Sequence, residues 1–171
     1  MRKFLTLLFV LGAVAGVFYL VGLILPRVHT RTARAEFTSQ PTVLYDAIAD
    51  IEAWDEWGPD MAHIERQPDR RDQELFEVLE PDGDRWLIEL GACERPLHFQ
   101  VFFEHGSERE TFRCELHRFG EGSTLRVTEQ GSTPDPWRRA LHLFRNEQLS
   151  LTDFLGALGR RIGENVKPED V

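Results

Sequence analysis

The feature that most constrains the fold of this chain is an uninterrupted apolar segment near its N-terminus, from Phe4 to Leu25. The segment contains 22 residues without a charge or a proline. As an α-helix it would be roughly 33 Å long, which is enough to cross a hydrocarbon core of about 30 Å. Two basic residues precede it, and Pro26 and Arg27 end it. We therefore expect residues 1–26 to form a transmembrane anchor that contacts the membrane through residues 4–25.

A cleaved signal peptide is the main alternative for this segment. The apolar part of a signal peptide usually has about 7–15 residues and ends at a small-x-small site. Here the apolar run is longer, and its exit through Leu23–Arg27 contains no such site. A buried core helix is less favoured, because the segment is apolar on every side. The sequence thus predicts a single-pass protein of the cell membrane. Basic residues flank both ends almost equally, so the side of the membrane that holds the remaining chain stays open.

The chain after the anchor has the length of one ordinary domain and a strongly acidic balance. Without Arg2 and Lys3 it contains 18 basic and 29 acidic residues, a formal charge of −11. Such a domain is repelled on average by nucleic acid and by anionic surfaces, so we expect no nucleic-acid partner. We expect residues 27–164 to form the domain and residues 165–171 a disordered tail.

The hydrophobic pattern predicts one strand, one helix, a run of strands and one long helix. Ala33, Ala35 and Phe37 alternate with charged residues, which is typical of a strand over 28–38. Pro41 is at a position that favours the first turn of a helix, and Gly58-Pro59 should end helical structure. Six alternating segments bounded by turn residues follow, with connections short enough for antiparallel hairpins: Ala62–Gln67, Gln73–Glu80, Arg85–Cys93, Leu97–His105, Glu110–Phe119 and Ser123–Gly131.

The last predicted element is a helix from about Pro136 to Ile162. Apolar residues recur in it at spacings of four and three, which places one long stripe on a single face. The members of the stripe are Trp137, Leu141, Phe144, Gln148, Leu151, Leu155, Leu158 and Ile162. A helix of this kind packs best across one face of an antiparallel sheet.

This order of elements resembles the helix-grip, START-like superfamily of polyketide cyclases and lipid-transport proteins (the SRPBCC proteins). The likeness covers about residues 25–163. Within the superfamily, the chain is similar to the small bacterial members with an N-terminal membrane helix. It depends on Leu25–Arg27, Pro41–Tyr45, Trp54–Pro59 and Gly122–Thr128. The resemblance implies an α+β fold, with a curved antiparallel sheet of about seven strands gripping the long C-terminal helix. It also implies an apolar cavity between sheet and helix, but it does not imply one activity.

The side chains that strand alternation directs toward the helix are almost wholly apolar. We find no Ser/His/Asp arrangement, no Cys/His pair at zinc spacing and no phosphate loop, and we expect neither a metal nor an organic cofactor. Glu110 and Glu115 are interpreted as solvated charges, and Cys93 and Cys114 as buried thiols, with a disulfide as the alternative.

We therefore expect a membrane-anchored binding module whose partner is an apolar small molecule or a lipid. The expected ligand-binding residues are Trp54, Trp57, Phe76, Trp86, Phe99, Val101, Phe103, Phe112, Leu116, Phe144, Gln148 and Leu151. Two alternatives remain open. One is a cyclase- or hydrolase-type enzyme using Gln148, Tyr45 or Arg118 in the same cavity. The other is a protein-interaction domain of the co-chaperone type, with an outward apolar patch of Leu75, Leu79, Leu87 and Phe102 and a partner that the sequence does not name.

Overall fold

The computed structural model describes residues 2–59, 63–80, 83–106, 108–133, 135–142 and 150–171; the side chains of residues 2–5, 7, 8 and 142 lie outside this description. The chain divides into two compact units. The first comprises Met1–His29 and Ser132–Gln148, and the second comprises Thr30–Gly131 and Leu149–Val171.

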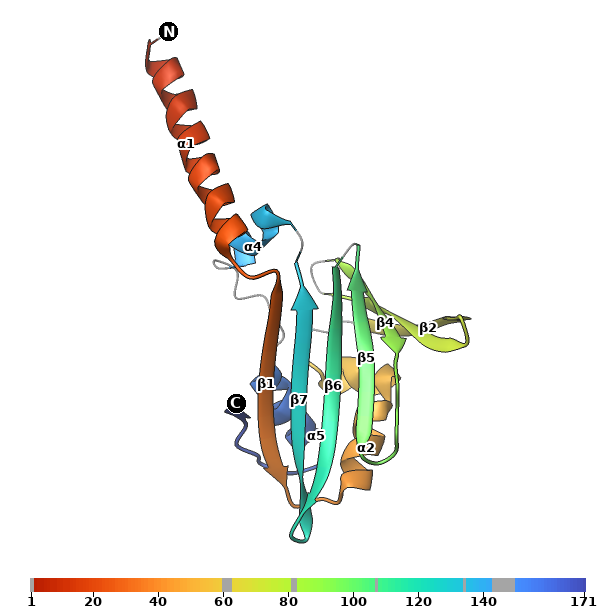
Figure 1. Cartoon of the computed structure of the whole chain (residues 1–171). Helices are drawn as coiled ribbons and strands as arrows, with labels where there is room; N and C mark the ends of the chain where they lie inside the picture. Colours follow the sequence, from red (N-terminus) through yellow and green to blue (C-terminus); the bar gives the residue numbers. More distant parts are fainter. Residues whose placement is uncertain (1, 60–62, 81–82, 107, 134, 143–149) are drawn as a thin grey trace. The chain divides into compact units, whose positions relative to one another are not determined.

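The first unit contains two helices that lie side by side, α1 (Arg2–Ile24) and α4 (Pro136–His142) (Figure 1). The helix expected over residues 4–25 is therefore present. Its apolar side chains are strongly exposed, as shown by Phe9 (77%), Val14 (61%) and Ile24 (84%). Among the residues whose side chains the structure describes, no helix is both long and apolar enough to cross a membrane.

The second unit is built on an eight-stranded sheet in the order β2-β3-β4-β5-β6-β7-β1-β8. The paired strands are antiparallel, in agreement with the α+β expectation. Their bounds are β1 (Val28–Phe37), β2 (His63–Arg70), β3 (Gln73–Leu79), β4 (Arg85–Leu90), β5 (His98–His105), β6 (Glu108–Phe119), β7 (Gly122–Ser132) and β8 (Glu169–Asp170). Each of the predicted segments between residues 62 and 131 corresponds to one of the strands β2–β7.

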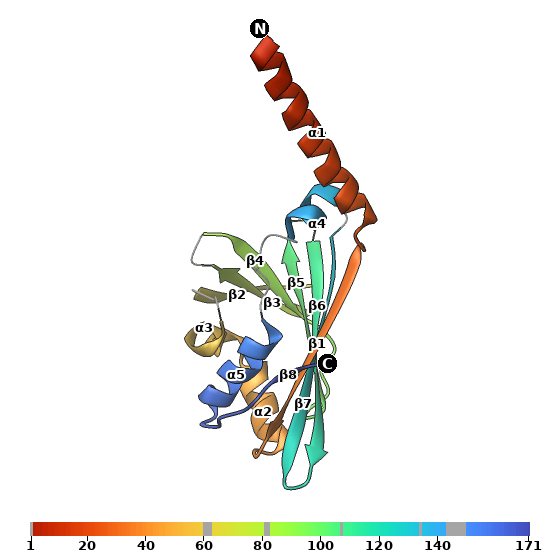
Figure 2. The same cartoon turned by 90° about the vertical axis from the view of Figure 1, so that its left-hand side faces the viewer.

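Helices cover one face of this sheet (Figure 2). They are α2 (Pro41–Ala49), the 3-10 turn η1 (Ile51–Ala53), α3 (Trp54–Trp57) and α5 (Leu151–Arg161). As the sequence predicts, Pro41 opens α2, and α3 ends where the Gly58 N–H donates to the Trp54 carbonyl. We call the covered face the inner face; the strands direct to it every second side chain, for example Phe99 and Val101 of β5, which are 1% and 0% exposed.

The single long helix expected over 136–162 is replaced by two helices, α4 and α5. Ser150 has an extended backbone, and its Oγ accepts a hydrogen bond from the Asp153 N–H at 3.3 Å, so a new helix begins at this cap. Trp137 and Leu141 of the predicted stripe are 42% and 47% exposed in α4. Phe144 and Gln148 lie outside the described residues. The spacing of the stripe continues across Ser150, so the sequence pattern did not predict that a new helix begins there.

The tail after residue 164 is ordered in the structure, in contrast to the predicted disorder. Glu169 and Asp170 pair with Arg34 and Ala33 as the edge strand β8. The Val171 N–H donates to the Thr32 carbonyl at 2.9 Å, and the Arg34 guanidinium contacts the Glu169 carboxylate at 3.1 Å. Backbone hydrogen bonds and an ion pair hold this segment. Such contacts do not require apolar side chains, so the polar composition of the segment did not predict its structure.

Candidate ligand-binding site

The inner face of the sheet is organised as rows of residues that lie opposite each other on successive strands. One row is Phe76, Ile88, Phe103 and Glu110, contributed by β3, β4, β5 and β6. Each row therefore combines side chains that are far apart in the sequence, and its character can change from apolar to acidic across the sheet.

One half of the inner face is filled by an aromatic cluster centred on Trp54. Trp54 is 0% exposed, and its ring centroid lies 5.6 Å from that of Phe154 and 6.3 Å from that of Phe112. Phe112 and Phe154 meet edge to face at 5.0 Å, which is a favourable geometry for aromatic pairs. The Trp54 indole N–H donates to the Ile48 carbonyl at 2.9 Å, which fixes the ring in the core. This half of the face is a packed core in the described part of the chain.

Beside this cluster the inner face retains accessible surface. Phe103 joins the two parts, because its ring centroid lies 6.5 Å from that of Trp54. Trp86 and Phe103 are half-buried, although Ile88 and Val101, two residues away on the same strands, are 0% exposed. The Trp86 ring stacks on the half-buried His105 imidazole, with 4.6 Å between centroids and 24° between planes. An aromatic surface of this kind can accept a flat apolar molecule. We call these three residues, Trp86, Phe103 and His105, the aromatic wall.

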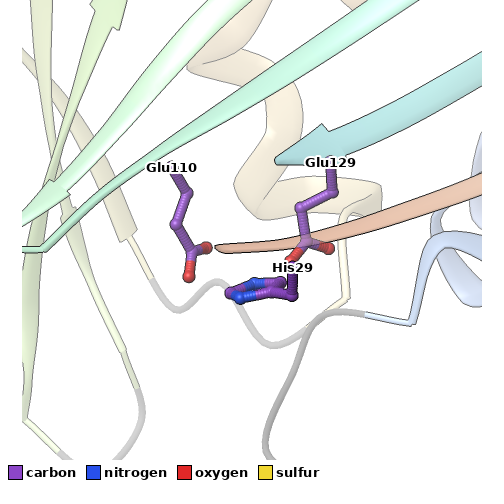
Figure 3. A group of neighbouring side chains, drawn as sticks. All are labelled: His29, Glu110 and Glu129. Carbon is purple, nitrogen blue, oxygen red and sulfur yellow. The ribbon is translucent and has the colours of Figure 1, made fainter. Parts of the chain in front are cut away.

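Two carboxylates border the aromatic wall on the side of β6 and β7. Glu110 has the same strand parity as Phe112, and Glu129 has the same parity as Val127, so both point to the inner face. Figure 3 shows the two side chains leaving neighbouring strands on the same side, and their oxygens approach within 4.8 Å. Glu129 is only 5% exposed, which is unusual for a carboxylate. His29, drawn in the same figure, belongs to the first unit and is not assigned to this site.

Two indole N–H groups lack a hydrogen-bond partner among the described residues. They belong to Trp57 and Trp86, and both nitrogen atoms are buried. Trp57 is half-buried and packs on Phe154 with 5.4 Å between centroids, whereas Trp86 is part of the aromatic wall. A buried donor without a partner is destabilising, and acceptance by a ligand would relieve that cost.

The expected ligand-binding residues on strands β3–β6 lie on the inner face, but strand alternation did not separate core from accessible surface. Phe76, Phe99, Val101, Phe112, Leu116 and Leu151 are all at most 5% exposed, together with Trp54. Trp57, Trp86 and Phe103 are the members that remain half-buried. Whether any of them contacts a ligand stays a prediction.

The acidic side of the site was missed by the sequence analysis, which interpreted Glu110 as a solvated charge. The parity that placed Phe112 and Val127 inward applies equally to Glu110 and Glu129, and this signal was present in the sequence. Glu115, which was interpreted in the same way, points to the opposite face and pairs with His98.

Two of the three polar residues proposed for catalysis, Tyr45 and Arg118, are described in the structure, and they lie in different surroundings. Tyr45 is 8% exposed and packs edge to face on Phe99 at 6.1 Å between centroids. Its burial and the neighbouring Cys93 thiol raise the pKa of its hydroxyl. Arg118 is exposed at the end of β6, and Gln148 lies outside the described residues.

The outward apolar patch expected for a protein-interaction domain is largely covered. Leu75 is 9% exposed, Leu79 is 37% exposed, and Leu87 and Phe102 are half-buried. The Arg109 guanidinium lies 4.2 Å from the centroid of the Phe102 ring. Arg109 and Arg70 both pair with Glu89 and Glu104, so a charged network overlies this part of the outer face.

The two cysteines differ in their environment and are both free. Cys114 is buried on the inner face, as expected, whereas Cys93 is exposed, contrary to expectation. Burial raises the pKa of the Cys114 thiol. The disulfide alternative is therefore not observed in this structure.

The second unit thus combines an antiparallel sheet, helices on its inner face and a partly accessible aromatic wall. No protein-family model matches the chain, and no curated protein sequence matches it. Solved structures, in contrast, match it over most of its length.

Three of these structures illustrate the likeness. TTHA0849 from Thermus thermophilus is 17% identical, with a TM-score of 0.63 over 78% of this chain and 97% of that chain. The ZhuI aromatase/cyclase from Streptomyces sp. R1128 is 13% identical, with a TM-score of 0.59 over 80% and 99%. Ara h 8.0201 is 17% identical, with a TM-score of 0.57 over 80% and 99%. At such identities the likeness concerns the fold, and it agrees with the predicted α+β architecture with one large antiparallel sheet.

Proposed function

We propose that this protein is a membrane-tethered module that binds an apolar small molecule carrying a hydrogen-bond donor. The aromatic wall receives the apolar body of the molecule, and Glu110 and Glu129 accept hydrogen bonds from its polar end. The observation that carries the proposal is the partial exposure of Trp86, Phe103 and His105 beside the packed aromatic core of the inner face, which Phe103 itself contacts.

The aromatic wall supports the apolar part of the ligand. Burial of apolar surface contributes about 25 cal/mol per Å² removed from water, so a molecule covering both Trp86 and Phe103 gains most of its affinity there.

The carboxylates determine the chemistry of the polar end. Glu110 and Glu129 accept hydrogen bonds when ionised, so they favour a hydroxyl, phenol or ammonium group and repel an anion. The chain from residue 30 onward is also acidic overall, with 17 basic and 29 acidic side chains once Arg2, Lys3 and Arg27 are set aside. We therefore expect neutral or cationic ligands.

The tether is proposed from the apolar segment and from its side chains in α1. The helix contains the 22-residue uncharged segment almost entirely, and Phe9, Val14, Val17 and Ile24 expose more than half of their surface. Exposed apolar side chains on every side of a helix are unfavourable in water and favourable in lipid. A tether would also raise the local concentration of the module near ligands dissolved in the membrane.

Binding is tested with two naphthalene probes that differ only in their polar group, 2-naphthol and 2-naphthoate. The full chain is placed in lipid nanodiscs, and energy transfer from tryptophan to the probe is measured against empty nanodiscs. We expect wild-type protein to prefer naphthol. Glu110→Gln should weaken naphthol binding by about tenfold, because a hydrogen bond to a charged group contributes about 1.5–3 kcal/mol. The same variant should strengthen naphthoate binding.

Glu115→Gln is the matched control, because Glu115 is on the same strand and is half-buried on the opposite face. It should change neither affinity. Equal affinities of wild type and Glu110→Gln for both probes would contradict the proposed role of the carboxylate. Absence of saturable binding for either probe would contradict the binding function itself.

The tether has an independent test. Membranes from cells that express the full chain are washed with alkaline carbonate, and the protein is followed by immunoblotting. We expect it to stay with the membrane fraction, whereas Val14→Glu, which introduces a charge at the middle of α1, should increase its release. Complete release of the wild-type protein would contradict the tether.

A second candidate function is a cyclase- or hydrolase-type enzyme at the same site. It is favoured by the proximity of the Glu110 and Glu129 oxygens, since carboxylates within hydrogen-bond reach of a substrate can act as general acid or base. The two functions can be distinguished by the mass of the molecule that co-purifies with the Glu129→Gln variant, compared with that held by the wild type. An enzyme would accumulate a molecule of different mass from that held by the wild type, and a binding module would hold the same molecule.

A further inference from the structure

The first unit contains a second apolar surface, on α4. Trp137 and Leu141 are four residues apart, on one side of this short helix, and they are 42% and 47% exposed. Arg139 and Ala140 are 5% and 0% exposed, so the helix has a buried side and an exposed apolar side. Their spacing predicted instead that Trp137 and Leu141 belong to a stripe that packs on the sheet.

This exposed surface is continuous with the apolar surface of α1. The Trp137 ring stacks on Phe18 with 5.8 Å between centroids and contacts Tyr19 at 5.9 Å. Gly22 allows this approach, because a Cβ at that position would collide with the Pro136 backbone. The Thr133 N–H also donates to the Arg27 carbonyl at 2.9 Å, which ties the segment before α4 to the end of α1.

The position of α4 along α1 indicates what covers it. Tyr19 precedes Leu25, the end of the apolar segment, by six residues, or roughly 9 Å of helix. A helix that lies in a membrane interface is buried by about 5–10 Å, and tryptophan and tyrosine are enriched at that level. Exposed basic side chains accompany the surface, Arg138 on α4 and Arg27 after α1. They match the negative charge of anionic lipid headgroups.

From these relations we infer that α4 is an interfacial helix that inserts Trp137 and Leu141 into the lipid surface beside α1. The occupant of the exposed apolar surface is the bilayer interface, and α4 is a second membrane contact in addition to the anchor. This inference rests on the proposed tether, because α4 reaches the interface only if α1 spans the bilayer.

The test measures the depth of single fluorophores in vesicles of phosphatidylcholine and phosphatidylglycerol. The full chain carries Cys93→Ser, and an environment-sensitive NBD label is attached to Leu141→Cys, Val14→Cys or Phe119→Cys. Lipids brominated in their acyl chains quench labels that enter the membrane. Phe119 is the matched control, since it is an exposed apolar residue of the second unit (60%).

We expect strong quenching at Val14, clear quenching at Leu141 from lipids brominated near the headgroup, and little at Phe119. Quenching at Val14 without quenching at Leu141 would overturn the interfacial helix and leave the tether intact. No quenching at either position would overturn both. Equal quenching at Leu141 and Phe119 would show unspecific adsorption and would also overturn the inference.

A second variant keeps the test independent of the labels. Trp137→Ser with Leu141→Ser removes both apolar side chains from α4 while α1 remains unchanged. We expect the chain to stay in the membrane fraction but to show increased cleavage by trypsin after Arg138 in intact vesicles. Unchanged cleavage would contradict the insertion of α4.

Discussion

The backbone N–H of Ser39, between β1 and α2, donates a hydrogen bond to the Glu164 carboxylate at 2.8 Å, just beyond the end of α5. The Thr38 N–H donates to the same carboxylate at 2.7 Å, and the Ser39 hydroxyl is a third donor. The Ser123 hydroxyl donates to the Ser39 carbonyl. One carboxylate thus joins the start of the helical layer to its end.

This carboxylate predicts an acid-sensitive contribution to stability. Partial burial raises the pKa of Glu164, but the hydrogen bonds from Ser39 and Thr38 outweigh burial and lower it below its ordinary value of 4.5. The contribution is complete above the unfolded pKa and is lost as the pH falls through the lower folded pKa. Glu164→Gln weakens these hydrogen bonds and should reduce the free energy of unfolding at neutral pH. The loss should be only about 1 kcal/mol, because water screens the partly exposed carboxylate. Urea unfolding in detergent micelles should show this difference shrinking below pH 4.5; a constant difference would contradict it.

The centre of the aromatic core should be intolerant of truncation. Trp54→Ala removes a fully buried ring that contacts Phe99, Phe112 and Phe154, and should cost about 3–5 kcal/mol of unfolding free energy. Trp54→Phe should cost less, because it keeps most ring contacts and loses the hydrogen bond to Ile48. Phe119→Ala, at an exposed position, should stay within about 0.5 kcal/mol of the wild type. Similar losses for Trp54→Ala and Phe119→Ala in chemical denaturation would be inconsistent with this core.

The two cysteines should react with very different rates. Cys93 is exposed, whereas Cys114 is buried and burial raises the pKa of its thiol, so little thiolate is available. Maleimide added to the native protein should modify one cysteine, identified as Cys93 by peptide mass spectrometry, and both should react in denaturant. Modification of Cys114 at the rate of Cys93 in the native protein would contradict its burial.

The charged network on the outer face should contribute in a salt-dependent way. Glu89 is 7% exposed and pairs with Arg70 and Arg109. Arg70→Met leaves this buried carboxylate with one guanidinium fewer, so it should destabilise the fold, and added salt should reduce the effect. Arg85→Met is the control, because its ion pair with Glu77 is more exposed. Equal effects of the two substitutions in thermal unfolding would argue against a special role for the network.

Most of the sheet could be predicted because alternation is a local signal. Strands β2–β7 alternate apolar and polar residues between clear turn residues, and their neighbours in sequence are also their neighbours in the sheet. Alternation also predicts which side chains point to the inner face, including Phe99, Val101 and Phe112.

The remaining features depend on interactions that a residue pattern does not contain. Glu110 and Glu129 have inward parity, but only the three-dimensional arrangement shows that the two carboxylates are neighbours. The break at Ser150 is a capping interaction that lies within the predicted stripe, whose helical spacing continues past it. Cys93 was expected to be buried because of its residue type, yet it follows the end of β4, where the alternation of the strand no longer applies.

The position of β1 in the sheet also has a consequence for synthesis of the chain. β1 is the first strand to be made, but it lies between β7 and β8, which are the last two. On the ribosome, the residues of β1 must therefore wait without either neighbour until the chain has been extended from Phe37 to Gly122 and beyond. Long-range pairing of this kind is slow and leaves strand edges open to wrong partners. During that interval the nascent chain would be the natural substrate of chaperones that shield unpaired strands.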